Sequence, residues 1–367
     1  MSNQHSNKTS DPKGYLSARY MFFSIALSVI SMGLVIYFTW TPDGFHYIRL
    51  KRLPGIMIAL VVALLRIWLS AAKMRYLADK ELTWMGAIRV ILTWDFASAI
   101  TPSTIGGAPV ATYAMTRENI SLGKSGAITL YGVLLDQLFY VLVIPFLIIA
   151  GFYIEVIPEG LGFVGSGAMF LVYAILLAYA FVLAYGLLVN PNSLRRVAGF
   201  VFKLPFLNRL KDKVDSELDT LVSFSSKISS KPKSFLFNAF LISTLAWLAK
   251  IALPTIVVLS FLPANEFLSL MRSFAMNFAG FFVPTPGGSG GMEGLFVVFQ
   301  GPLFDRTVFI GISVFVWRVL TYYLSIGLGM MVMTWYMKPI NQELANFDEH
   351  SANAEANAAD SNSPITR

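Results

Sequence analysis

The sequence has no cysteine, so disulfide bonds, thiolate metal sites and cysteine nucleophiles are excluded. It has only three histidines. His5, His46 and His350 lie in a polar N-terminal stretch, a loop and a polar C-terminal stretch, so we expect no histidine chemistry inside a core. It also has no phosphate-binding loop of the GxxxxGKS or GxxxxGKT type, which argues against ATP-driven transport. These absences predict a protein without a metal site or other cofactor.

Charged residues are scarce as well. Only 13% of the 367 residues are charged, whereas 56% are hydrophobic and the mean hydropathy is +0.63. This composition is typical of an integral membrane protein. The formal charge of +7 is best explained by basic loops at the cytoplasmic face of an anionic bilayer, and we expect no nucleic-acid partner. Because apolar segments occupy most of the length, we expect one membrane domain and no soluble catalytic domain.

Six apolar segments are long enough to cross roughly 30 Å of hydrocarbon as helices that rise about 1.5 Å per residue. We therefore predict an all-α integral membrane protein whose single membrane domain spans 20–337. The polar stretches 1–19 and 338–367 are expected to be disordered. The six predicted spans cover about 20–40, 54–72, 125–151, 163–189, 234–263 and 307–337.

Two runs of proline, glycine and small polar residues interrupt otherwise apolar sequence. The first break, TPSTIGGAP, covers 101–109, and the second break, PTPGGSGGME, covers 284–293. Such backbone has free N–H and C=O groups that cannot face lipid, so it must pack inside the protein or line a wet cavity. We expect each break to be the tip of a re-entrant helical hairpin, although two ordinary kinked helices are an alternative. The predicted hairpin limbs are 84–100, 109–115, 268–283 and 291–299.

The residues around the two breaks recur at matched spacing. Asp136 lies 29 residues after Gly107, and a tyrosine follows four residues later. Arg318 lies 30 residues after Gly288, and a tyrosine again follows four residues later. A basic residue precedes each break within the preceding span, by 41 residues in the first half and by 38 in the second. The residues that complete this pattern are Tyr140, Tyr322, Arg66 and Lys250.

This pattern predicts two repeat units of span, hairpin and span, at about 54–151 and 234–337. Between them, the connector 190–233 contains nine basic and four acidic residues, so the positive-inside rule places it in the cytoplasm and the acidic loop 152–162 outside. The units would then form an inverted-topology repeat, which is typical of secondary transporters, and both chain termini would be cytoplasmic. Apolar residues at helical spacing within 210–222 predict an amphipathic helix on the membrane or on the bundle.

A glycine-rich turn that leads into a helix presents unpaired N–H groups to one spot, which suits a phosphate or another anionic headgroup. Thr101 and Ser289 could cap such helices or bind the ligand, and Glu293 could interact with the helix N-terminus, a cationic headgroup or Arg318. Buried charges should face the interior in pairs, and we expect an Asp136–Arg318 pair. The predicted substrate-binding residues are Arg66, Thr101, Pro102, Gly106, Gly107, Pro109, Asp136, Tyr140, Lys250, Thr285, Pro286, Gly287, Gly288, Ser289, Gly290, Glu293, Arg318 and Tyr322.

The stretch AITPSTIGGAPV at 99–110 with Asp136, and the stretch PTPGGSGGMEG at 284–294 with Arg318, resemble the transmembrane domain of lysylphosphatidylglycerol synthases and their stand-alone, flippase-like relatives. The resemblance covers about 20–337. It implies a domain that moves phospholipid between leaflets, aminoacylated phospholipid in the synthases, with re-entrant helices around a lipid cavity. The synthases add a soluble aminoacyltransferase domain that we do not expect here, so the resemblance implies no synthesis activity.

Together, the residues and the resemblance favour a lipid translocase, not an enzyme, that works by alternating access in the cytoplasmic membrane of a prokaryote. Its partners would be membrane phospholipids and a separate lipid-modifying enzyme, and a homo-oligomer is left open. One alternative is a membrane-embedded enzyme or accessory protein acting on a polyprenyl- or glycan-linked lipid. Another is a transporter of a small soluble anion. Against catalysis stands the lack of convergent histidines, cysteines or paired carboxylates in the apolar segments.

Overall fold

The computed structural model describes residues 18–40, 53–101, 107–158, 162–193 and 211–336, and the regular secondary structure in these ranges is helical, with no β-strand among them. Five helices in this part of the chain are long and apolar enough to cross a membrane. They confirm a multi-pass, all-α membrane protein. The five candidate spans are Leu53–Leu77, Leu122–Ala150, Phe170–Val189, Lys233–Phe261 and Val308–Tyr336.

The remaining predicted span, 20–40, corresponds to α1 (Ala18–Thr39). Its apolar part, Ile25–Thr39, is shorter than the five candidate spans. The long helices are α3 (Leu53–Leu77), α6 (Leu122–Ala150), α7 (Gly162–Ala184), α10 (Lys233–Phe261) and α13 (Val308–Arg318), which continues through a π-helical turn, Val319–Tyr323, to Tyr336. The shorter helices are α4 (Trp84–Ile100), α5 (Gly107–Arg117), α9 (Lys211–Ser229), α11 (Glu266–Ala279) and α12 (Gly291–Gln300).

Side-chain caps begin the first short helix of each half. Thr83 accepts a hydrogen bond from the Gly86 N–H at the start of α4, and Asn265 accepts one from the Leu268 N–H at the start of α11. These bonds satisfy N–H groups that have no partner within the helix. The two halves also share one order of helices, which is long, short, short and long. It is α3, α4, α5 and α6 in the first half, and α10, α11, α12 and α13 in the second.

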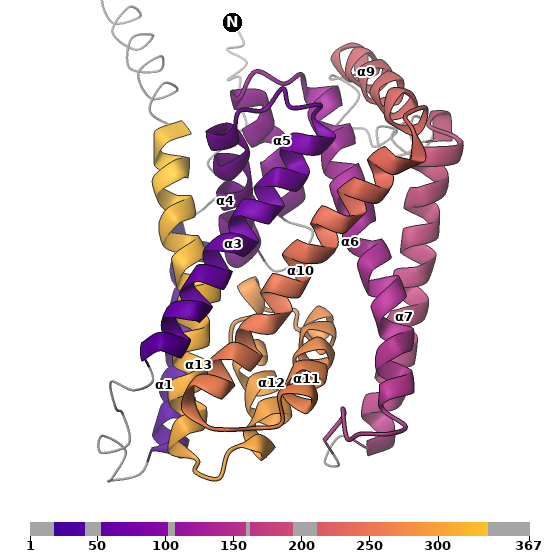
Figure 1. The fold of residues 1–367 in the computed structure, drawn as a ribbon. Coiled ribbons are helices and arrows are strands. Elements are labelled where there is room, and N and C mark those ends of the chain that lie inside the picture. Colours follow the sequence, from indigo (N-terminus) through magenta and orange to yellow (C-terminus); the bar gives the residue numbers. More distant parts are fainter. Residues whose placement is uncertain (1–17, 41–52, 102–106, 159–161, 194–210, 337–367) are drawn as a thin grey trace, which may run out of the picture.

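The two halves pack through their first helices. α3 and α10 run antiparallel: Gly55, at the start of α3, lies against Ser260, near the end of α10, and Tyr76 stacks on Phe235 at the opposite ends. The short helices α4 and α5 lie toward one end of the bundle, the same end as α9, whereas α11 and α12 lie toward the other end (Figure 1). The structure thus separates the two pairs of short helices along the long axis of the bundle.

The second break packs against the end of α4. Gly287 has a φ of 59°, and a Cβ at this position would lie 2.4 Å from the Tyr322 ring and 2.7 Å from the Ala99 carbonyl oxygen. Only glycine fits this left-handed conformation and close approach without strain. Segments more than 180 residues apart, the end of α4 and the second break, are therefore in contact.

The first break lies largely outside the described residues. The predicted site residues Pro102 and Gly106 fall in this part of the chain. Gly107 begins α5, two residues before the predicted start at 109, and Pro109 lies in its first turn. The side chains of Trp94 and Ser98 lie so close to Gly107 that a Cβ there would be 2.5 Å from the Trp94 ring. Tight packing between α4 and α5 thus explains this glycine.

The predicted amphipathic helix is α9, and it lies on the bundle. Glu217 accepts a hydrogen bond from the Gly123 N–H at 2.6 Å, and the Tyr131 hydroxyl donates to the Ser225 carbonyl at 3.1 Å. Phe224 and Ile228 of α9 are buried. Its apolar face therefore packs against α6 and its neighbours, which decides between the two positions that the sequence left open.

The arrangement of the turns can be tested by labelling, because the chain has no native cysteine. Ser121 lies in the turn between α5 and α6, Ser230 in the turn between α9 and α10, and Asp305 in the turn between α12 and α13, and all three are exposed. We expect single cysteines at Ser121 and Ser230 to react with a membrane-impermeant maleimide from the same side, and a cysteine at Asp305 from the opposite side. Labelling of all three from one side would contradict this arrangement.

Candidate functional site

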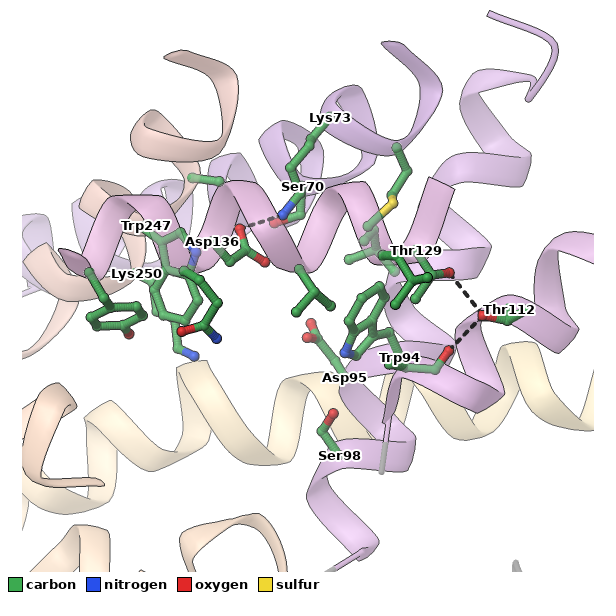
Figure 2. Close-up of a pocket in the computed structure, with 18 of the residues that line it drawn as sticks. Ser70, Lys73, Trp94, Asp95, Ser98, Thr112, Thr129, Asp136, Trp247 and Lys250 are labelled. Carbon is green, nitrogen blue, oxygen red and sulfur yellow. Dashed lines mark hydrogen bonds and ion pairs between the residues drawn. The ribbon is translucent and has the colours of Figure 1, made fainter. Parts of the chain in front are cut away.

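A cavity of about 510 Å³ lies between the helices of the first half and α10 of the second. Its walls come mainly from α3, α4, α5 and α6, with Tyr179 from α7 and Phe281 from the turn after α11. Polar and charged side chains converge on it although it lies in an apolar bundle (Figure 2). The charged lining residues are Arg66, Lys73, Asp95, Asp136 and Lys250.

Both carboxylates in the cavity wall have basic partners. Asp95 is 2.7 Å from an Arg66 guanidinium nitrogen, and Asp136 is 2.6 Å from the Lys73 ammonium. The Ser243 hydroxyl, from α10, donates a second hydrogen bond of 2.6 Å to the same Asp136 oxygen. Pairing of this kind offsets much of the cost of removing ions from water. These two ion pairs join α3 to α4 and α3 to α6.

Lys250 stands apart from these pairs. It makes no ion pair with any described residue, and its ammonium instead lies 4.5 Å from the centre of the Trp247 ring. In Figure 2 Lys250 lies beside Trp247, on the far side of Asp136 from Lys73. A cation–π contact compensates a buried charge only in part. Lys250 is therefore the basic side chain of the described lining that has no carboxylate to balance it.

The rest of the lining is mainly apolar and aromatic, and one part reaches the outside of the bundle. Trp94, Trp247 and Phe281 line the cavity together with Tyr179, which is 38% exposed near the middle of its span. The cavity therefore extends toward the side surface of the helix bundle. Gln137 also lines it, and its Oε1 atom is buried without a hydrogen-bond partner in the described part of the chain.

A second charged cluster lies at the second break and outside the cavity lining. Glu293 is fully buried, and its carboxylate is 2.6 Å from Arg318, which is 4% exposed. The carboxylate also accepts hydrogen bonds from the Gly290 N–H at 2.9 Å and from the Ser28 hydroxyl at 3.1 Å. Arg318 in turn donates to the Gly288 carbonyl at 3.0 Å. This ion pair is used within the fold to hold the backbone of the second break.

The hydroxyl groups of the second break have internal partners too. The Ser289 hydroxyl lies 3.2 Å from the Tyr322 hydroxyl, and the Thr285 hydroxyl donates to the Ser289 carbonyl at 2.7 Å. Pro286 is buried. Most polar atoms of this break that are described above therefore make hydrogen bonds within the protein.

A further network joins α4 and α5 to the last span. Arg89 makes two hydrogen bonds of 2.8 Å to the Glu118 carboxylate, which also accepts one of 2.7 Å from the Tyr336 hydroxyl. Burial alone would raise the pKa of Glu118, but the hydrogen bonds from Arg89 and Tyr336 outweigh it and the pKa is lowered. Glu118 is therefore ionised at neutral pH and links the two halves near α9.

A comparison with known protein families identifies the family of this membrane protein. A family model described as the lysylphosphatidylglycerol synthase TM region matches residues 20–329 of the 367. This chain belongs to that family. It is also 23% identical over 313 residues to a UPF0104 membrane protein of Archaeoglobus fulgidus, across 82% of this chain and 92% of the relative. The match takes in every helix described here, apart from the ends of α1 and of the last span.

For this family member, several expectations about individual residues need correction. The predicted Asp136–Arg318 pair does not form, because Lys73 and Glu293 are the respective partners. Thr101 is not an N-cap: it ends α4, and its hydroxyl donates to the Ala97 carbonyl. Ser289 is not an N-cap either, because Gly290 occupies that position of α12.

The predicted site residues divide between two places. Five of them line the cavity: Arg66, Pro109, Asp136, Tyr140 and Lys250. Those of the second break, with Arg318 and Tyr322, form the closed cluster around Glu293, and the remaining described residues, Thr101 and Gly107, lie at the ends of α4 and α5.

Two charged residues of the cavity were missed. Lys73 lies seven residues after Arg66, and therefore on the same face of α3, but the span was predicted to end at residue 72. Asp95 lies in the predicted hairpin limb 84–100, but it was not considered as a site residue.

We predict that Glu293→Gln destabilises this family member by about 3–5 kcal/mol, because it leaves the buried Arg318 unpaired. The double variant Glu293→Gln, Arg318→Met should lose less than the sum of the two single variants, since both charges are then removed. Thermal unfolding of the purified protein in detergent measures this. Strictly additive losses would show that the pair does not hold the second break.

Proposed function

We propose that this protein is a lipid translocase in which the cavity carries a phospholipid headgroup across the membrane while the acyl chains stay in the bilayer. The observation that carries the proposal is Lys250, a basic side chain without a carboxylate partner in the described lining of a cavity inside an apolar bundle. Intramembrane ions usually mark a substrate path. A phosphate group is a suitable partner for such a cation.

The dimensions of the cavity support a headgroup more than a whole lipid. Its volume of about 510 Å³ falls within the range of small-molecule sites, roughly 300–1,000 Å³. Acyl chains would need an opening to the bilayer, and the exposed Tyr179 lies where the cavity approaches the side surface. A transporter of a soluble anion would instead need a path closed to lipid along its whole length.

We further propose that the two halves form an inverted-topology repeat with two re-entrant hairpins, and that transport uses alternating access between them. The same order of long and short helices in each half supports this, as do the opposite ends at which α4–α5 and α11–α12 lie (Figure 1). The contact of Gly287 with Ala99 brings the second break to the limb that leads into the first. The basic connector would face the cytoplasm of a prokaryotic cell, and membrane phospholipids would be the partners.

The alternative of a membrane-embedded enzyme on a polyprenyl- or glycan-linked lipid draws on the two carboxylates in the cavity. Asp95 and Asp136 each have a basic partner, however, so both carboxylates already make ion pairs within the protein. The geometry therefore favours binding of a charged headgroup over acid–base catalysis.

The proposal predicts that filling the cavity stops transport. Val133 lines the cavity, whereas Val182 of α7 is 63% exposed on the outer surface. In liposomes with fluorescent phospholipid, Val133→Trp should slow loss of the lipid from the inner leaflet by at least about tenfold, equivalent to ~1.4 kcal/mol in barrier height. The matched variant Val182→Trp should transport at the wild-type rate.

Phospholipids, a polyprenyl phosphate and a soluble phosphate ester are compared in the same liposomes, and thermal unfolding checks that both variants are folded. Wild-type protein that moves none of the lipids would refute the translocase proposal. Chemical conversion of the polyprenyl phosphate without transport would favour the enzyme, and movement of only the soluble ester would favour an anion transporter.

A further inference from the structure

We infer that the cavity selects a headgroup with one net negative charge, a phosphodiester without an amino group, and disfavours net-cationic aminoacylated headgroups. The inference rests on the proposed function and names the substrate class of the same site. It follows from a balance of charges among the described residues of the lining.

The charges in the wall add up to one uncompensated cation. Arg66 with Asp95, and Lys73 with Asp136, form two neutral pairs at 2.7 Å and 2.6 Å. Lys250 is the fifth charged lining residue and makes no ion pair with a described residue. The described lining therefore carries a net charge of +1, from three basic and two acidic side chains.

Lys250 is partly buried, and no carboxylate of the described residues forms an ion pair with it. Its ammonium lies against the face of Trp247, and such an aromatic contact is weaker than an ion pair in a site removed from water. A phosphodiester carries a single negative charge and brings two free oxygens, so it would make the site neutral and accept hydrogen bonds from the ammonium. A dianionic or neutral headgroup would leave a charge unbalanced.

An aminoacylated headgroup fits less well, because it adds ammonium groups. Each ammonium would need an anionic partner, but Asp95 and Asp136 are already paired with Arg66 and Lys73. Separating either pair would leave an unpaired buried base, which costs more than the new contact returns.

The test compares three acyl-labelled lipids in separate liposomes: phosphatidylglycerol, phosphatidylethanolamine and lysylphosphatidylglycerol, with net charges of about −1, 0 and +1 at neutral pH. We expect wild-type protein to move phosphatidylglycerol at least about tenfold faster than lysylphosphatidylglycerol, since a tenfold preference corresponds to one charge-assisted hydrogen bond. Lys250→Met should abolish this preference, and Lys250→Glu should reverse it. Lys227→Glu, on an exposed lysine of α9, should leave it unchanged.

The outcomes separate the two proposals. If wild-type protein moves all three lipids at equal rates, or prefers lysylphosphatidylglycerol, the charge-selection inference is wrong while the translocase proposal stands. If it moves none, the translocase proposal itself fails. If Lys250→Glu does not fold, Lys250→Met still decides, because a retained preference for phosphatidylglycerol in that variant overturns the role of Lys250.

A last arm identifies the source of the phosphate. Glycerophosphoglycerol, a soluble phosphodiester with one negative charge, is added on both sides of the membrane at millimolar concentration. We expect no inhibition of lipid transport, because a soluble ester lacks the acyl chains that anchor the headgroup at the cavity. Strong inhibition that disappears in Lys250→Met would assign the site to a free phosphate ester and overturn the lipid assignment.

Discussion

The need to pair every polar group inside an apolar bundle determines much of this structure. Glu293 shows the constraint most clearly: it is fully buried, and its carboxylate takes up Arg318, the Gly290 N–H and the Ser28 hydroxyl. These contacts hold together the second break, the last span and α1. Without them, the non-helical backbone at this depth would have no partners for its free groups. The position of Gly287 against Ala99 depends on the same cluster.

The two halves contain the same order of helices but use their charges differently. In the first half the charges line a cavity, whereas in the second half Arg318 and Glu293 form a buried ion pair with each other. Gly287 of the second break packs against Tyr322 and the end of α4. Lys250 is the exception, because α10 of the second half carries it into the cavity of the first. The net charge of the cavity therefore depends on how the two halves pack together.

Much of the fold could be predicted, because long apolar segments and Gly–Pro breaks have few alternatives in a bilayer. The helix at Trp84–Ile100 has the predicted limits, and α12 and α10 agree within a few residues. The site was harder. Spacing alone suggested that Asp136 and Arg318 pair, but their partners are Lys73 and Glu293. Periodicity shows which face of a helix a charge occupies, and not which charge of another helix it meets.

The sequence by itself determined that this is a helical membrane protein, the approximate limits of most of its helices, and that the second backbone break and several charges lie in its interior. Composition and local propensity are sufficient for these features, because the bilayer excludes most other arrangements. Only the tertiary structure decided which charges pair, that the second break is closed, and that Lys250 enters the cavity without a carboxylate among the described residues. Those outcomes depend on distances of a few ångströms between helices far apart in the chain, which no local pattern contains.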